Sequence, residues 1–121
     1  AASACQALDL VNVKPGRVGG VVACTEVLDA MRRRELSGFC GGMYELAIGR
    51  AVSLAVAAHP DLCAQPSDLG PSASYVERDL ADPHVLRPDG TIAIPTGEGI
   101  GRDPSPERLA ELTVEVSEHP R

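Results

Sequence analysis

The chain has 121 residues, 44% of them hydrophobic and 23% charged, which is enough for one small globular domain with a modest core. Its formal net charge of −6 argues against nucleic acid or an anionic membrane surface as the main partner. No apolar run approaches the roughly 18–20 residues needed to cross a bilayer, and no signal peptide is recognisable, so a membrane-bound or secreted protein is not expected.

The first half of the chain repeats the order strand, glycine-rich turn, helix. A strand is predicted over residues 8–14, where apolar and polar residues alternate, and the proline and glycines of residues 15–20 predict a loop. Apolar residues at helical spacing predict a helix from about 20 to 36, followed by a short strand over 37–40. A second helix is expected over 44–59, almost free of charge and therefore buried. This alternation favours an α/β fold with a parallel sheet or barrel.

The second half is richer in turn residues. Residues 66–74 read as a loop around Asp68, which would stand at a third strand position. Residues 84–95 predict a hairpin with a Pro-Asp-Gly turn. A short helix is expected after Ser105, a typical N-cap residue that is followed by proline. The alternating residues 112–118 predict a closing strand.

Cysteine and histidine positions suggest no disulfide scaffold and no metal site. Cysteine occurs four times, without a Cys-x-x-Cys spacing, at Cys5, Cys24, Cys40 and Cys63. Reduced thiols in the cytoplasm are the expected state. The three histidines are isolated from one another and from other ligand types at suitable spacing. The absence of an initiator methionine leads us to expect a processed or truncated chain.

Candidate site residues follow the predicted strands, because the carboxyl ends of parallel strands hold the chemistry in β/α proteins. Lys14 ends the first strand, where a lysine acts as a base or stabilises an anion, unless it only extends to solvent. Gly42 and Met43 end the second, and glycine there allows close approach of a ligand. Glu45 is either a site residue or a helix cap, and Asp68 is either a site residue or a turn residue.

Three segments together resemble the C-terminal part of the enolase superfamily. They are VNVKPGRVGG, CGGMYELAIGRA and ERDLADP with the downstream DGTIAIPTGEGIG. More narrowly, they are similar to the branch of o-succinylbenzoate synthases and N-acylamino acid racemases. The resemblance implies about the last three β/α units of a TIM-type (β/α)-barrel, within residues 1–80. Residues 81–121 would then be a hairpin and strand segment that belongs to the capping domain.

The resemblance also implies the chemistry. Members of the family use magnesium and lysines to move a proton α to a carboxylate through an enediolate. Lys14 matches the lysine of the sixth barrel strand, which exchanges the proton in the racemases and stays cationic in the synthase of menaquinone biosynthesis. Gly42, Met43 and Asp68 match positions that line the acyl side of the pocket. A small carboxylate substrate is implied, and a homo-oligomer for the full enzyme.

Parts of the family pattern are absent from the sequence. The Lys-x-Lys motif and the three acidic magnesium ligands of earlier strands are not found, so the chain corresponds to roughly the last third of such an enzyme. The sequence also departs from the family pattern at Leu46, Ser67 and Ala73-Ser74. We therefore predict that the isolated chain is inactive. The alternative is a non-catalytic, truncated half-barrel that binds or assembles with a partner. Nucleotide binding at 97–101 is disfavoured, because the glycines lack a preceding strand and a following helix.

Overall fold

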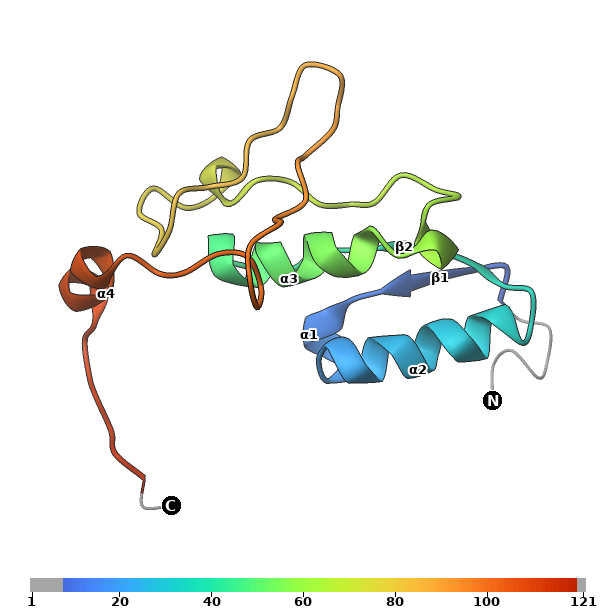
Figure 1. Ribbon diagram of the computed structural model, residues 1–121, viewed down its shortest axis with the longest axis horizontal. Helices are drawn as coiled ribbons and strands as arrows, with labels where there is room; N and C mark the ends of the chain where they lie inside the picture. The colour runs from blue at the N-terminus through green and yellow to red at the C-terminus, as the bar shows by residue number, and fades with distance from the viewer. Residues whose placement is uncertain (1–7, 120–121) are drawn as a thin grey trace.

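A computed structural model describes residues 8–119 (Figure 1). The elements are β1 (Leu10–Val13), α1 (Pro15–Val18), α2 (Val21–Arg32), β2 (Ser37–Cys40), α3 (Ala47–Ala57), the 3₁₀ helices η2 (Pro60–Leu62) and η3 (Ser72–Ser74), and α4 (Pro106–Leu112). The strands β1 and β2 pair in parallel, as the alternation of strands and helices predicted. The expectation of an α/β fold with a parallel sheet is therefore confirmed.

The sheet is small, and β2 lies between β1 and a third piece of extended chain. Val13 is opposite Cys40 in the register, and the next residue, Gly41, donates its N–H to the carbonyl of Val13 at 3.0 Å. On the other side Gly41 forms a parallel bridge with Asp68. The N–H of Gly42 donates to the Asp68 carbonyl at 2.9 Å. The third strand position is thus reduced to a single bridge, which still brings three carboxyl ends to one edge.

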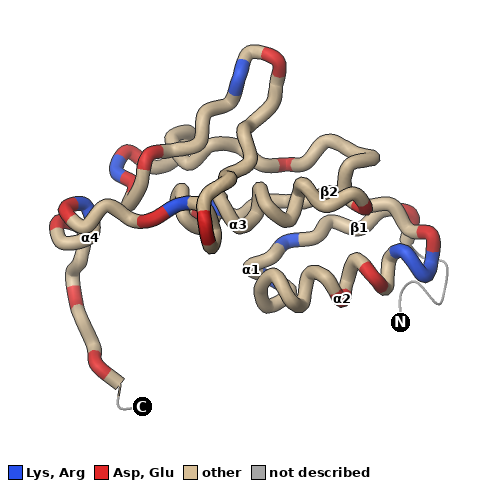
Figure 2. The backbone as a smooth tube through the Cα atoms, viewed as in Figure 1, with Lys and Arg blue, Asp and Glu red and all other residues tan. Residues whose placement is uncertain are grey.

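The core lies between the strands and the helices α2 and α3, which run side by side along them (Figure 1). Its buried members come from both strands, both helices and η2, namely Val13, Cys24, Leu28, Met31, Cys40, Val56 and Leu62. Figure 2 shows that α3 carries hardly any charge, in keeping with its predicted burial. Gly38 of β2 is buried, and atoms of the core lie very close to its Cα. A Cβ there would lie closer than 3.0 Å to Met31 and to the carbonyl oxygen of Val11.

Several predicted boundaries in the first half were wrong, among them the end of the helix expected to about residue 36, which is at Arg32. Residues 15–18 form the short helix α1 and not a loop, because Pro15 suits the first position of a helix. The helix then ends at Gly19 and Gly20, with φ of 104° and 103°, which side chains other than glycine rarely adopt. The helix predicted from residue 44 begins only at Ala47, since the preceding residues form a loop held by side-chain hydrogen bonds.

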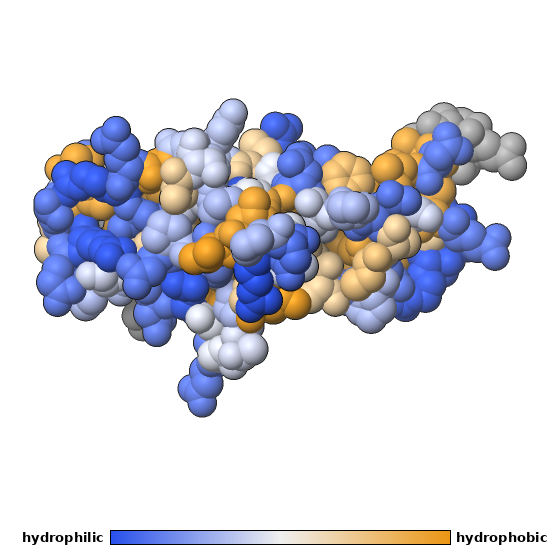
Figure 3. All heavy atoms as spheres, turned by 90° about the horizontal axis from the view of Figure 1, so that it is seen from above, coloured by the Kyte–Doolittle hydropathy of each residue, from blue (hydrophilic) through white to orange (hydrophobic). Residues whose placement is uncertain are grey.

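The predicted hairpin is present as a turn with one antiparallel bridge. Leu86 pairs with Ile92, and the N–H of Gly90 donates to the carbonyl of Arg87 at 2.9 Å. The hairpin projects from the rest of the chain (Figure 1). Viewed from above, the surface of the molecule shows hydrophobic residues among hydrophilic ones (Figure 3). Val85 and Leu86 of the hairpin are exposed hydrophobic residues.

The C-terminal helix was predicted correctly, but the strand after it was not. The Ser105 hydroxyl accepts a hydrogen bond from the N–H of Arg108 at 3.3 Å, which caps α4 as expected. Leu112 belongs to this helix. The following residues are extended but pair with no strand in the described part of the chain, and Val114 and Val116 are exposed. Alternation alone does not make a strand when no neighbouring strand offers hydrogen bonds.

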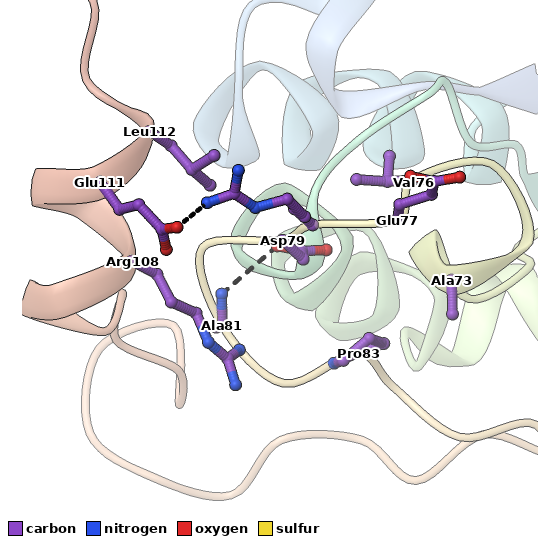
Figure 4. A pocket seen from close by; sticks show the side chains of 10 residues that line it. Ala73, Val76, Glu77, Asp79, Ala81, Pro83, Arg108, Glu111 and Leu112 are labelled. Atoms are coloured by element: carbon purple, nitrogen blue, oxygen red, sulfur yellow. Dashed lines mark hydrogen bonds and ion pairs between the residues drawn. The ribbon is translucent and has the colours of Figure 1, made fainter.

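Exposed ion pairs tie α4 to the segment before it, around a hollow of about 320 Å³ (Figure 4). Glu111 pairs with Arg78, and Arg108 pairs with Asp82 at 2.8 Å. Surface pairs of this kind contribute at most about 1 kcal/mol each. The helix is therefore weakly held within this chain. Between residues 8 and 119, no helix has the length and apolar character needed to cross a membrane.

Candidate active site

Lys14 lies directly after β1 and begins the site. Its backbone is extended, with φ of −120° and ψ of 107°, and Pro15 starts α1 immediately after it. The half-buried side chain donates from Nζ to the carbonyl oxygen of Gly42 at 3.1 Å. A Cβ on Gly41 would lie closer than 3.0 Å to Lys14 Nζ and to the side chain of Asn12. Glycine at position 41 therefore makes room for the lysine between the two strand ends.

The structure brings the other predicted residues to the same edge. Gly42, Met43 and Asp68 line one hollow of about 350 Å³, together with Tyr44, Arg50, Gly70 and Tyr75. Lys14 does not line this hollow itself but reaches it through the Gly42 carbonyl. Met43 and Asp68 are both exposed. The prediction that these strand-end residues lie together is consistent with this geometry, whereas their roles stay predictions.

Arg50 is a residue that the sequence analysis did not single out. It lies in the first turn of α3 with only 2% of its surface exposed. Its Nη2 donates to the Met43 carbonyl at 2.9 Å and to the Tyr75 hydroxyl at 3.1 Å, and it lies 2.9 Å from Oε2 of Glu45. A single arginine in an otherwise uncharged, buried helix was the signal in the sequence, because charged residues are almost never fully buried unless they are paired.

One of the two interpretations of Glu45, that it caps α3, is wrong. Glu45 precedes the helix, and its Oε1 accepts a hydrogen bond from the N–H of Met43 at 2.9 Å. The Tyr75 hydroxyl donates to the Glu45 carbonyl at 2.5 Å, and the Tyr75 ring meets Tyr44 edge to face. The loop between β2 and α3 is thus held at both its backbone and its side chains.

The start of α3 is capped by a residue 32 positions further along the chain. Leu46, at the N-cap, has no side chain that could accept a hydrogen bond. Instead both oxygens of buried Asp79 accept from the N–H of Ala47, at 2.9 and 3.1 Å. Burial by itself would raise the pKa of Asp79, but the nearby Ser72 hydroxyl and the backbone N–H groups outweigh it and lower that pKa.

His84 binds the same turn of the helix. Its Nε2 lies 3.1 Å from the carbonyl of Ala47, so the neutral ring donates from Nε2. Its Nδ1 faces Arg102 at 3.5 Å. Burial lowers the pKa of His84, and the positive charges of Arg102 and Arg50 lower it further, against the opposing effects of the Ala47 hydrogen bond and of Asp79. A protonated ring would direct an N–H at the Arg102 guanidinium.

We expect the stability of the chain to fall in mild acid because of His84. The folded state lowers the pKa of the ring below its ordinary value of 6.5, so the unfolded state takes up the proton first. The stabilisation is complete above pH 6.5 and is lost as the pH falls through the folded pKa. Asp79 extends the loss below pH 3.8, since its pKa is also lowered. The melting temperature, followed by circular dichroism from pH 7.5 to 5, measures the effect.

His84→Gln is the matched variant, because its side-chain amide still donates to Ala47 but does not titrate. Its melting temperature should depend less on pH than that of the wild type between pH 7 and 5. Equal slopes for the two proteins would rule out His84 as the source.

The described residues do not provide a metal site. Within residues 8–119, no group of three or more His, Cys, Asp or Glu side chains could hold a metal ion. The magnesium that the resemblance implies therefore does not fit these residues. Cys24, Cys40 and Cys63 are free thiols, and Cys5 lies outside the described residues. Burial raises the pKa of Cys40 to about 11, so this thiol is not a nucleophile at neutral pH.

Comparison with known proteins defines the class of protein. Residues 1–108 match the family described as enolase C-terminal domain-like, and the chain belongs to this family. The arrangement of β1, α2, β2 and α3 also recurs in a solved structure, that of a probable mandelate racemase from Alicyclobacillus acidocaldarius. It has 32% sequence identity and a TM-score of 0.85, over 94% of this chain and 30% of that one. The resemblance found in the sequence is thereby confirmed.

Two relatives with named activities are similar to most of this chain. An N-succinylamino acid racemase from Amycolatopsis is 39% identical over 107 residues, which are 88% of this chain and 28% of the relative. An o-succinylbenzoate synthase from Geobacillus kaustophilus is 36% identical over 113 residues, which are 89% of this chain and 30% of the relative. The chain thus spans less than a third of the length of these relatives.

Proposed function

We propose that the chain is the C-terminal part of an enzyme that moves a proton α to a carboxylate, either an o-succinylbenzoate synthase of menaquinone biosynthesis or an N-succinylamino acid racemase. The observation that carries the proposal is the position of Lys14. It is at the carboxyl end of β1, half-buried, with its Nζ 3.1 Å from the Gly42 carbonyl beside a hollow. The names of the Amycolatopsis and Geobacillus relatives support the choice of reaction.

Lys14 acts on the α-carbon of the substrate in one of two ways. As a neutral amine it takes and returns the proton on one face, which is the role needed for racemisation. As an ammonium it stabilises the negative charge of the enediolate, which is the role needed when another group removes the proton. Since Lys14 is the only lysine in the sequence, a second lysine of the reaction comes from outside this chain.

Gly42, Met43 and Asp68 bind the acyl portion of a small carboxylate substrate. They line the same hollow next to the Gly42 carbonyl that holds Lys14. The backbone of Gly42 allows close approach, whereas exposed Met43 offers an adaptable apolar contact. An acyl chain bound in this hollow would adjoin the Gly42 carbonyl that accepts from Lys14, which supports the proposal.

We further propose that residues 1–80 complete a (β/α)-barrel with preceding strands and that residues 81–121 belong to the capping region. The strand β1 has one strand partner, β2, and within residues 8–119 no strand pairs with its other edge. The magnesium ion is held by side chains outside residues 8–119. The complete enzyme is a cytoplasmic homo-oligomer.

The proposal is tested by sequencing the complete reading frame that encodes this chain and by assaying its product. We expect the sequence upstream of the codon for Ala1 to carry a Lys-x-Lys motif and three acidic residues at strand ends. The purified product should form o-succinylbenzoate or exchange the α-proton of N-succinylamino acids with deuterium, which NMR detects. An upstream stop codon, or a complete product without either activity, would favour the non-catalytic half-barrel.

The isolated chain should show no turnover. Residues 8–119 provide no metal site, and the single lysine leaves one face of the substrate without its base. Purified 121-residue chain is incubated with magnesium and each substrate, and the products are followed by NMR. Magnesium-dependent product above the buffer control would show that the chain is sufficient by itself and would contradict this prediction.

A further inference from the structure

We propose that Arg50 is a positioning residue that sets the place of Lys14 through the loop between β2 and α3. This inference rests on the proposed function, because it assigns Arg50 a part in the work of Lys14. Among the described residues no hydrogen bond joins Arg50 to Lys14, but both side chains lie against Gly42. The chain of contacts therefore runs from Arg50 to the loop and from the loop to the lysine.

The first step is the set of polar contacts that Arg50 makes with the loop. Its Nη2 donates to the carbonyl of Met43 at 2.9 Å, while Glu45, paired with the same nitrogen at 2.9 Å, accepts from the N–H of Met43 at 2.9 Å. The peptide groups on both sides of Met43 are thus bound to one ion pair. Hydrogen bonds to charged groups are about twice as strong as neutral ones, so this loop has little freedom.

The second step is the contact of the guanidinium with Gly42. A Cβ on Gly42 would lie closer than 3.0 Å to Nη1 of Arg50, so the guanidinium rests directly against this residue. On the other side the N–H of Gly42 is bound to the Asp68 carbonyl at 2.9 Å. Gly42 is therefore held by the sheet and by Arg50, and its carbonyl accepts the hydrogen bond from Lys14 Nζ at 3.1 Å.

The third step is the support of Arg50 itself. The Tyr75 hydroxyl accepts from Nη2 at 3.1 Å and donates to the Glu45 carbonyl. Arg50 Nε and Nη1 are buried and have no hydrogen-bond partner among the residues that the structure describes. Leaving donors of a buried guanidinium without partners is costly, and such a cost persists in proteins mainly where a group serves function.

Because Lys14 is the only lysine in the sequence, the reactivity of its amine can be measured without interference from other lysines. The rate of acylation of Lys14 by an amine-specific acetylating reagent is determined in the 121-residue chain by peptide mapping, with the α-amino group as internal reference. The variants are Arg50→Met, Arg50→Lys and Tyr75→Phe, and the control is Arg78→Met, which removes an exposed guanidinium. Circular dichroism confirms that each variant is folded before its rate is compared.

We expect Arg50→Met to raise the relative acylation rate of Lys14 about tenfold, since loss of a hydrogen bond to a charged group changes an equilibrium by roughly that factor. Tyr75→Phe should give a smaller rise, and Arg50→Lys should restore part of the protection because it keeps the charge but not the planar fork. Arg78→Met should match the wild type. If Arg50→Met does not fold, Tyr75→Phe and Arg50→Lys carry the test.

The complete enzyme supplies the second readout. Arg50→Lys and Tyr75→Phe should lower kcat by about 10- to 100-fold, because a small displacement of a catalytic group impairs the chemical step. Both residues also line the hollow, so a rise in KM with unchanged kcat would report a role in binding alone and would contradict the positioning of Lys14. Unchanged acylation in all folded variants would overturn the inference and leave the proposed function standing. A complete enzyme without activity, combined with faster acylation in the variants, would overturn the proposed function and leave the positioning by Arg50 intact.

Discussion

Replacing Lys14 by methionine should abolish turnover of the complete enzyme, with kcat reduced by about 10²–10⁴-fold, the usual contribution of a general acid or base. Methionine has a similar length, so it keeps the packing of the strand end and removes only the amine. The Gly42 carbonyl then loses its donor, but the half-buried position allows water to replace it. Initial rates of o-succinylbenzoate formation and of α-proton exchange measure the effect.

Lys14→Arg separates the two roles proposed for the lysine. Arginine stays protonated at any usable pH, so it stabilises an anion but cannot act as a base. Racemisation should be lost in this variant, whereas dehydration should keep part of its rate. Arg78→Met serves as the control and should leave both rates unchanged. If Lys14→Met retains full activity in both assays, Lys14 has no part in the reaction.

Gly38→Ala should destabilise the chain strongly. The added methyl group would lie 2.9 Å from the carbonyl oxygen of Val11 and closer still to Met31, in the middle of the β1–β2 pair. Backbone cannot move there without breaking the register. Overpacking of this kind costs about 1–3 kcal/mol or more, a large part of the stability of a small domain. Urea unfolding followed by circular dichroism gives the free energy.

Gly16→Ala is the matched control. A Cβ at this position in α1 meets nothing within 4 Å, and alanine is preferred to glycine in helices by about 1 kcal/mol. The two glycine-to-alanine changes should therefore have opposite signs. A Gly38→Ala midpoint equal to that of the wild type would mean that the core relaxes around the methyl group, and the close packing at β2 would not matter.

The sequence predicts best those elements whose signals are local. The strand β2 was predicted to the residue, because a short apolar run stands between turn residues, and Lys14 was placed correctly at the end of β1. The cap of α4 was also predicted, since Ser105 and the proline after it form a self-contained signal.

Contacts between distant residues were not predictable in the same way. Arg50 binds Tyr75, 25 residues away, and the N–H of Ala47 is bound by Asp79, 32 residues away. No spacing rule connects such partners, so the contacts of Arg50 and the true start of α3 were missed. The strand expected over 112–118 failed for a related reason, because a strand depends on a neighbour that alternation within one segment cannot specify.

The long-range cap on α3 has a consequence for recombination among related genes. A crossover that falls between Ala57 and Ser72 would take Ala47 from one parent and Asp79 from another, and would divide Arg50 from Tyr75 as well. A crossover before Leu10 would transfer all four residues together with Lys14. We expect viable chimeras to exchange this region as one block, so that shuffled libraries should show few survivors with junctions inside it.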